Sequence, residues 1–156
     1  MLTNLFKSVL HNIGVLVVGF AFAFLGTELD LLLGLHPFHS LLTTITAWLL
    51  LAMGFLLRIW ATYDFYQRRM KVIVLVPQTS MIITGPYRFT RNPLYLGGNV
   101  FIFGGAVLWL GSPGGLILTA VVIIATDFMI RREEKQLEKT FGEEFIRYKI
   151  RVRRWL

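Results

Sequence analysis

Two short stretches of the sequence concentrate side chains that could bind a small charged ligand. One is GPYRFTRNPLYLGGN, residues 85–99, and the other contains the adjacent acids Glu133 and Glu134. Asn92-Pro93 is a strong start signal for a helix, and a helix N-terminus offers free N–H groups to an anionic group such as a carboxylate. The paired glutamates could hold a cationic group, although acids at a helix end are also common as solvated residues. We therefore expect residues 85–99 to form one wall of a ligand site.

Glycines recur along the helix that is expected to begin at Pro93. Gly104 and Gly111 share one face, which favours close approach of a neighbouring helix, because small residues permit such contacts in membranes. Gly97 and Gly98 lie near the beginning of the helix, where helix packing and close approach of a bound ligand are equally open interpretations. These two glycines are therefore included among the expected ligand-binding residues.

A polar face continues along the last long helix. Four charged residues share one side of it at helical spacing: Asp127, Arg131, Glu134 and Glu138. Asp127 lies inside an apolar run, where a charge is costly and faces protein or water. Arg58 has a similar place near the end of an earlier run. Arg58 and Asp127 could form a structural ion pair, or they could line a pocket and contact a substrate.

The composition indicates a membrane protein. Of the 156 residues, 55% are apolar and 16% are charged, whereas about a quarter of residues are charged in a typical soluble domain. There is no cysteine, which excludes disulfides and thiolate chemistry, and the three histidines lack the spacing of metal ligands, so no metal site is expected. The net charge of +7 comes from basic residues that flank apolar runs, a pattern of membrane proteins and not of nucleic-acid-binding proteins.

Four apolar runs are long enough to cross a membrane: residues 9–25, 41–60, 94–110 and 114–130. The first could continue as far as residue 35. Because backbone groups in lipid must be satisfied internally, these runs are expected to be helices. The turn sequence GSPGG joins the last two as an antiparallel hairpin. The sequence therefore predicts an all-α, polytopic membrane bundle that forms a single domain over residues 1–156.

The distribution of basic residues predicts how this bundle is oriented. The segment 27–40, which holds Glu28 and Asp30 and is expected to be a loop, contains no Lys or Arg, nor does the turn at 111–113. Basic residues lie mainly in the 66–93 loop and the C-terminal tail, so both chain termini and that loop are expected in the cytoplasm. An alternative is that the first run is a signal peptide cleaved after Ala23, which would leave three spans.

The C-terminal tail predicts an amphipathic helix in the membrane interface. Its apolar residues recur at helical spacing, with arginines on another face: Phe141, Phe145, Tyr148, Val152 and Trp155. This helix could anchor the topology or close over a site that opens to the bilayer. The apolar run 72–77 is too short to span, and it could lie in the interface or cover the same pocket.

Taken in this order, the two motif stretches resemble the integral-membrane methyltransferases. GPYRFTRNPLYLGG, followed downstream by REEKQLEKTFGEEFIRYKIRVRRWL, is similar to the pattern of isoprenylcysteine carboxyl methyltransferases and phospholipid N-methyltransferases. The resemblance covers about residues 81–156, nearly half of the chain. It implies S-adenosylmethionine as the cofactor, bound by this half on the cytoplasmic side. It also implies a lipophilic acceptor, isoprenyl-carboxylate-like or a lipid, that enters from the bilayer.

Position by position, the resemblance assigns expected roles to residues of this chain. Arg91 and Glu134 are the expected catalytic residues, with Glu134 also contacting the cofactor. The other matched positions are expected to bind the cofactor, together with Gly98: Tyr87, Arg88, Asn92, Pro93, Tyr95, Gly97 and Glu133. Asn92 departs from the family pattern, which has His in the better-characterised members. An amide cannot titrate, so a mechanism with a base at this position is not supported.

Two other classes remain open from the sequence. Sterol-reductase-like membrane enzymes that use NADPH carry a similar Arg-His-Pro-Asn-Tyr element, and a non-catalytic membrane scaffold would keep the bundle without binding a cofactor. The Asn-Pro-Leu-Tyr order and the later Glu-Glu and Phe-Gly elements favour methyl transfer. The acceptor could be an isoprenoid carboxylate, a phospholipid amine, or a small hydrophobic thiol or alcohol.

Overall fold

The structure is a computed structural model that describes residues 2–70, 72 and 80–156. All the regular elements within these residues are helical, which confirms the all-α prediction. The long helices are α1 (Leu2–Leu33), α2 (Leu41–Gln67) and α5 (Pro113–Phe141). The shorter ones are η1 (Gly85–Arg88), α3 (Pro93–Tyr95), η2 (Leu96–Ile102), α4 (Phe103–Leu110) and α6 (Glu143–Arg151).

Four helical segments of the described chain are long and apolar enough to cross a membrane, as the sequence predicts. They are Leu2–Leu33, Leu41–Gln67, the continuous run Pro93–Leu110, and Pro113–Phe141. The first, second and fourth exceed the roughly 20 residues that a bilayer requires. Each of these three helices is therefore longer than the crossing of a bilayer requires.

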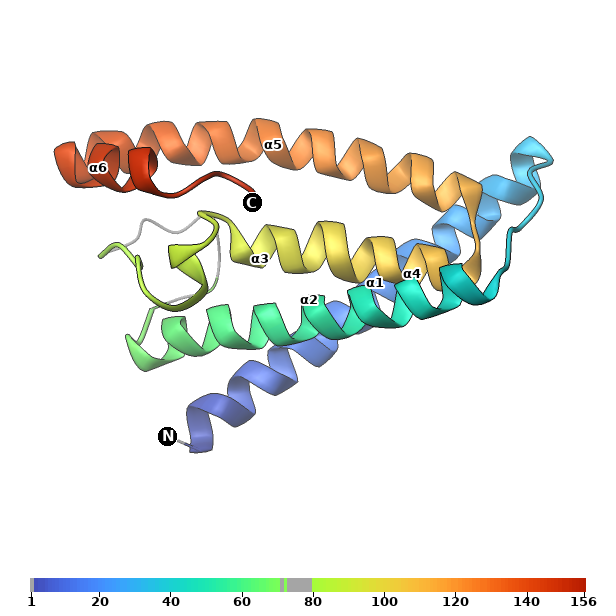
Figure 1. Cartoon of the computed structure of the whole chain (residues 1–156), viewed down its shortest axis with the longest axis horizontal. Helices are drawn as coiled ribbons and strands as arrows, with labels where there is room; N and C mark the ends of the chain where they lie inside the picture. Colours follow the sequence, from blue (N-terminus) through green and yellow to red (C-terminus); the bar gives the residue numbers. More distant parts are fainter. Residues whose placement is uncertain (1, 71, 73–79) are drawn as a thin grey trace.

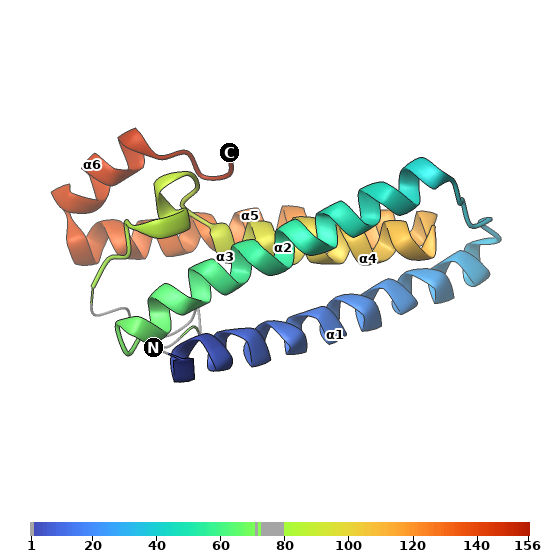
Figure 2. The same cartoon turned by 60° about the horizontal axis from the view of Figure 1, so that its bottom comes forward.

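The helices form an elongated bundle whose functional elements gather at one end. In Figure 1, α3 and α4 lie between α2 and α5, while α1 crosses the bundle at an angle and packs against α2, α4 and α5. The N-terminus, η1 and α6 lie towards one end, and the two connections between long helices lie at the other (Figures 1 and 2). At that other end the Phe38 N–H donates to the Gly111 carbonyl at 2.9 Å. That the η1 and α6 end faces the cytoplasm stays a prediction.

Glu28 and Asp30, which were expected in a loop, belong to the last turns of α1. Asp30 is buried, and its Oδ1 accepts a hydrogen bond from the Gly114 N–H at 2.6 Å, at the start of α5. The first N–H groups of a helix have no partner inside that helix, and a carboxylate satisfies one of them well. The acid therefore joins α1 to α5, which explains why a charge is kept at the end of an apolar helix.

The close contact between α1 and α5 leads to a stability prediction. A Cβ added at Gly26 would lie 2.4 Å from the Gly115 Cα, and a backbone atom cannot move aside as a side chain can. We expect Gly26→Ala to destabilise the bundle by about 1–3 kcal/mol. The matched control in the same helix is Gly14→Ala, because a Cβ there meets nothing within 4 Å. Thermal unfolding in detergent measures the stability of both variants. Equal unfolding midpoints for the two variants would contradict so close a contact between α1 and α5.

The third span differs from the single regular helix that the sequence predicts. Its middle, η2, is π-helical, and a Cβ at Gly97 would lie 3.0 Å from the Gly54 carbonyl of α2. The prediction that Gly104 and Gly111 allow a neighbouring helix to approach closely is wrong. Gly104 has open space around it, and Gly111 ends α4 at a φ of 63° against the 34–40 connection. Gly105 makes the close contact with α2 instead, near the Ala47 carbonyl.

The tail forms a shorter helix than its apolar spacing suggests. α6 buries Phe145 and Tyr148, as expected, but it ends at Arg151. Residues 152–156 leave the helix in an extended conformation and turn back along the bundle (Figure 1). The run 72–77, which was expected to lie in the interface or over the pocket, falls outside the described residues except for Val72.

Candidate functional site

The fold brings the two motif stretches into direct contact. The Tyr95 hydroxyl, at the end of α3, donates to Glu133 Oε1 of α5 at 2.8 Å. The Arg91 Nη2 atom, in the turn before α3, lies 3.1 Å from Glu134 Oε1. The short connection between α4 and α5 makes these helices antiparallel neighbours. Residues about 40 positions apart therefore meet at one end of the hairpin, as the sequence predicts.

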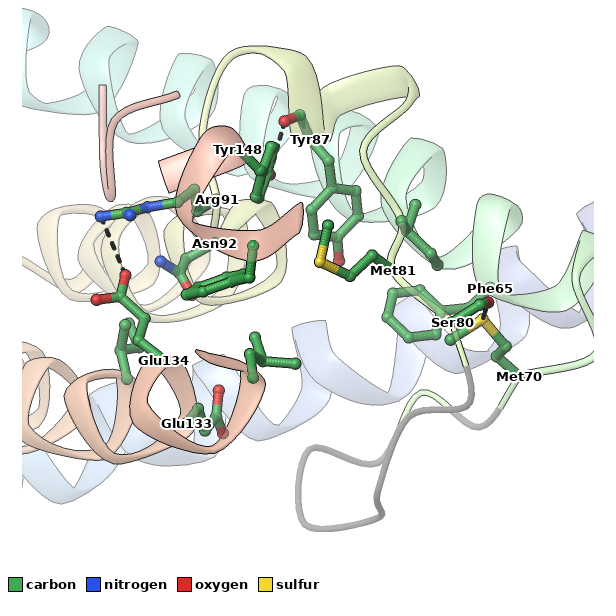
Figure 3. A pocket seen from close by; sticks show the side chains of 14 residues that line it. Phe65, Met70, Ser80, Met81, Tyr87, Arg91, Asn92, Glu133, Glu134 and Tyr148 are labelled. Carbon is green, nitrogen blue, oxygen red and sulfur yellow. Dashed lines mark hydrogen bonds and ion pairs between the residues drawn. The ribbon is translucent and has the colours of Figure 1, made fainter. Parts of the chain in front are cut away.

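A cavity lies where these residues meet. Its empty space is about 590 Å³ including the open mouth. Arg91, Asn92, Glu133 and Glu134 supply its charged and amide groups (Figure 3). Most of the remaining wall is apolar or aromatic, from Phe65, Met70, Met81, Ile82, Tyr87, Ile130, Leu137, Phe145 and Tyr148. The arrangement suits a ligand that has both a charged part and a flat apolar part.

Glu134 is the most strongly paired acid of the site. Its side chain is 8% exposed, and its oxygens lie 3.1 Å from Arg91 Nη2 and 2.7 Å from Arg154 Nη2. A buried carboxylate between two guanidiniums is already satisfied without a ligand. Glu134 therefore links the turn before α3, α5 and the C-terminal tail, which is a structural role in addition to any contact with a ligand.

Arg91 combines this ion pair with unused donors. Its side chain is 10% exposed, and its Nε and Nη1 atoms are buried with no hydrogen-bond partner among the described residues. A buried N–H group without a partner costs free energy, and a ligand that accepts from these donors would remove that cost. Each of these N–H groups suits an anionic acceptor such as a carboxylate oxygen.

The C-terminal tail was expected only as a helix that could close over a site, and the sequence did not predict its contacts with the turn before α3. The Arg154 carbonyl accepts from Thr90 Oγ1 and Asn92 Nδ2, both at 3.0 Å, and the Arg153 carbonyl accepts from the Arg91 N–H at 2.9 Å. Helix α3 begins at Pro93 as predicted. The Asn92 side chain binds the tail, however, and makes no capping hydrogen bond. The bond to Glu134 raises the pKa of Arg154, so this guanidinium stays charged.

Two tyrosines form the floor of the cavity next to α6. Tyr87 and Tyr148 are buried, and burial raises the pKa of both hydroxyls, so both remain neutral. The Tyr148 hydroxyl donates to the Tyr87 carbonyl at 2.8 Å and ties α6 to η1 (Figure 3). Tyr87 also packs on Phe65 of α2, with ring centroids 6.1 Å apart. The floor is therefore an apolar, aromatic surface.

The remaining expected cofactor-binding residues lie around this cavity and not in its wall. Arg88 is exposed at the end of η1, and Pro93 is buried at the start of α3. Gly97 and Gly98 pack against the Arg58 side chain. Tyr95 contacts Glu133 but lines a second cavity, between α1 and the third span. The structure therefore brings Tyr87, Arg91, Asn92 and both glutamates together in the cavity wall, and the other five expected residues do not line this cavity.

The expected pair of Arg58 and Asp127 does not form. Arg58 donates from Nε to Asn12 Oδ1 at 2.8 Å and from Nη1 to the Leu94 carbonyl. Asp127 pairs with Arg131 at 2.7 Å and with Arg154 at 3.4 Å. The reason is the order of the helices, since the third span lies between α2, which carries Arg58, and α5, which carries Asp127 (Figure 1).

The fold and the site define the class: a helical integral membrane protein with a charged and aromatic ligand cavity at one end of its bundle. A model of the phospholipid methyltransferase family matches residues 42–144, and the chain belongs to this family. It is therefore a membrane methyltransferase, and the resemblance seen in its motifs is confirmed.

Two relatives are similar to parts of this chain. An uncharacterized protein of Haemophilus influenzae is 48% identical over 50 residues, which are 31% of this chain and 79% of that protein. Methanethiol S-methyltransferase 1 of Bradyrhizobium diazoefficiens is 38% identical over 66 residues, which are 42% of this chain but only 22% of that protein. The second match therefore concerns one segment of a larger enzyme. No solved structure matches the chain.

Proposed function

We propose that this protein transfers a methyl group from S-adenosylmethionine to a lipophilic acceptor at the cytoplasmic face of a membrane. The cofactor would bind in the cavity between η1, α3 and α5. The observation that carries the proposal is that Arg91, which has two unpartnered N–H donors, lines the same cavity as Glu133. Family membership supports the reaction type, and the lipid-facing helices support a lipophilic acceptor.

The residues of the cavity fit the charges of this cofactor. Its amino-acid end has a carboxylate, which suits an unpartnered N–H group of Arg91. It also has an ammonium group, which suits Glu133, because Oε1 accepts one bond from Tyr95 and no described residue binds Oε2. The aromatic surface of Tyr87, Phe145 and Tyr148 suits a purine ring. Glu133 is therefore the more available of the two glutamates.

When bound, S-adenosylmethionine supplies an electrophilic methyl group on a sulfonium. The chain's own contribution is to hold donor and acceptor in line and to keep water out. Arg91 and Glu133 would fix one end of the site, and Tyr95 would hold Glu133 in place through its hydroxyl. A carboxylate acceptor needs no base, whereas an amine would have to arrive neutral, because the Asn92 amide cannot titrate.

The proposal is tested by the effect of cofactors on thermal unfolding. A ligand at about ten times its Kd stabilises the folded state by about 1.4 kcal/mol, which raises the midpoint by about 3–6 °C in a protein of this size. We expect this shift with S-adenosylmethionine and with its demethylated product, S-adenosylhomocysteine, and none with NADPH. A shift with NADPH alone would favour a reductase, and no shift with any of them would favour a non-catalytic scaffold.

A further inference from the structure

A second cavity lies between α1 and the third span, deeper in the bundle than the first. Its empty space is about 900 Å³ including the open mouth. Its polar lining comes from His11, Arg58, Tyr95 and Asn99, beside Gly14 and Gly98. Apart from Val72, every lining residue belongs to a membrane-spanning helix. The membrane-spanning lining therefore suits a lipophilic molecule.

Arg58 has no anionic partner among the described residues that line the second cavity. It donates to two neutral acceptors, the Asn12 side chain and the Leu94 carbonyl, and it forms no ion pair with a described residue. No Asp or Glu lines the described part of the cavity, and the sequence has none at residues 71 and 73–79. An unpaired charge inside a membrane is expensive and marks a functional position. A bound anion would remove that cost.

The surrounding residues hold the guanidinium at the cavity wall. Asn12 accepts from Arg58, and its own Nδ2 donates to the Ser8 carbonyl at 2.8 Å and to Thr62 Oγ1 at 2.9 Å. This buried network fixes two of the guanidinium nitrogens, and Nη2 makes no hydrogen bond to a described residue. One donor of a rigidly held cation therefore remains available to a ligand.

The π-helical stretch makes room for this side chain. A Cβ at Gly97 would lie 2.7 Å from Arg58 Cγ, and one at Gly98 would lie 2.9 Å from Arg58 Nη1. The glycines let the Arg58 side chain lie directly on η2. Local π-helical turns within α-helices are frequent at functional sites. Arg58 is thus positioned by two glycines, a local change in helix type and a buried polar network.

We propose that this second cavity binds the oxyanion group, carboxylate or phosphate, of a lipophilic molecule, and that Arg58 pairs with it. The inference rests on the proposed function only in naming this molecule as the methyl acceptor. Tyr95 lines this cavity, and its hydroxyl bonds Glu133, which lines the first. The two cavities therefore adjoin at the Tyr95–Glu133 pair, so the anionic end of the bound molecule would lie towards the cofactor site.

The test compares three ligands with the same chain in protein held in phosphatidylcholine nanodiscs. Oleate carries a carboxylate, oleyl phosphate a phosphate, and oleyl alcohol no charge. We expect one or both anions to bind at least about tenfold more tightly than the alcohol. Arg58→Gln should remove this preference and leave the affinity for the alcohol unchanged. A preference for oleate identifies a carboxylate site, and a preference for oleyl phosphate identifies a phosphate site.

Two further variants keep the test decisive. Arg132→Gln removes an exposed arginine of α5 and should bind all three ligands as the wild type does. Gly14→Leu adds a side chain at a glycine whose Cβ position is open space, without touching the Arg58 network, and should weaken all three. The proposal is overturned if the wild type binds the anions no better than the alcohol, or if Arg58→Gln retains the preference.

Cofactor binding separates this inference from the proposed function. In the same samples, Arg58→Gln should bind S-adenosylmethionine with wild-type affinity, because Arg58 does not line the first cavity. Binding of oleate without binding of S-adenosylmethionine would reject the proposed function and keep the anion site. Binding of S-adenosylmethionine without binding of the anions would keep the methyltransferase assignment and reject Arg58 as the residue that binds an anion.

Discussion

Replacing Arg91 with methionine should lower the affinity for S-adenosylmethionine by about 10- to 100-fold, as expected for the loss of charge-assisted hydrogen bonds worth about 1.5–3 kcal/mol. The change removes the two buried donors, Nε and Nη1, that have no other partner. Glu134 keeps an ion pair with Arg154 at 2.7 Å, so its charge remains compensated. Titration calorimetry on detergent-purified protein measures the affinity, and thermal unfolding shows that the variant is folded.

The chain provides a matched control three residues away. Arg88 was also expected to bind the cofactor, but it is exposed and does not line the cavity. Arg88→Met removes the same charge from the same segment and should leave the affinity within about twofold, as is usual for surface positions. An equal loss in both variants would mean that overall positive charge attracts the cofactor. No loss in either would reject the Arg91 site.

The sequence predicts the contact between the two motif stretches because that contact depends on local features. A short turn forces α4 and α5 to run antiparallel, and helical spacing places the acids at the same level as Tyr95. The sequence could not separate Glu133 from Glu134. Consecutive residues point about 100° apart on a helix, so one acid meets a tyrosine and the other meets two arginines.

Other features depend on which helices are neighbours, and apolar periodicity does not determine this. Arg58 and Asp127 lie near corresponding ends of their spans, yet the third span separates them. The tail was expected to be an interfacial helix from its apolar spacing. The helix forms but ends at Arg151, and the carbonyls of Arg153 and Arg154 accept hydrogen bonds from Thr90, Arg91 and Asn92, which lie far away in the sequence. No local pattern signals such backbone contacts.

Replacing Glu134 with glutamine should have the largest effect on stability. The carboxylate is 8% exposed between Arg91 and Arg154, and its loss leaves both guanidiniums without an anion at this position. Removing one partner of a buried pair costs about 3–5 kcal/mol. Arg154 is 23% exposed and keeps Asp127 at 3.4 Å, so the lower end of that range is expected. The unfolding midpoint in detergent should fall by about 6–12 °C.

The same substitution should release the tail, since Arg154 is the ionic link between residues 152–156 and α5. Limited trypsin digestion should therefore cut faster after Arg151 and Arg153 in Glu134→Gln than in the wild type. Glu133→Gln is the control, because Glu133 has no ion pair with a described residue. It should keep the wild-type midpoint and tail protection but weaken S-adenosylmethionine binding. An unchanged unfolding midpoint and unchanged digestion in Glu134→Gln would contradict this prediction. The ion pairs of Glu134 with Arg91 and Arg154 would then not stabilise the fold, and the hydrogen bonds to its backbone carbonyls would hold the tail.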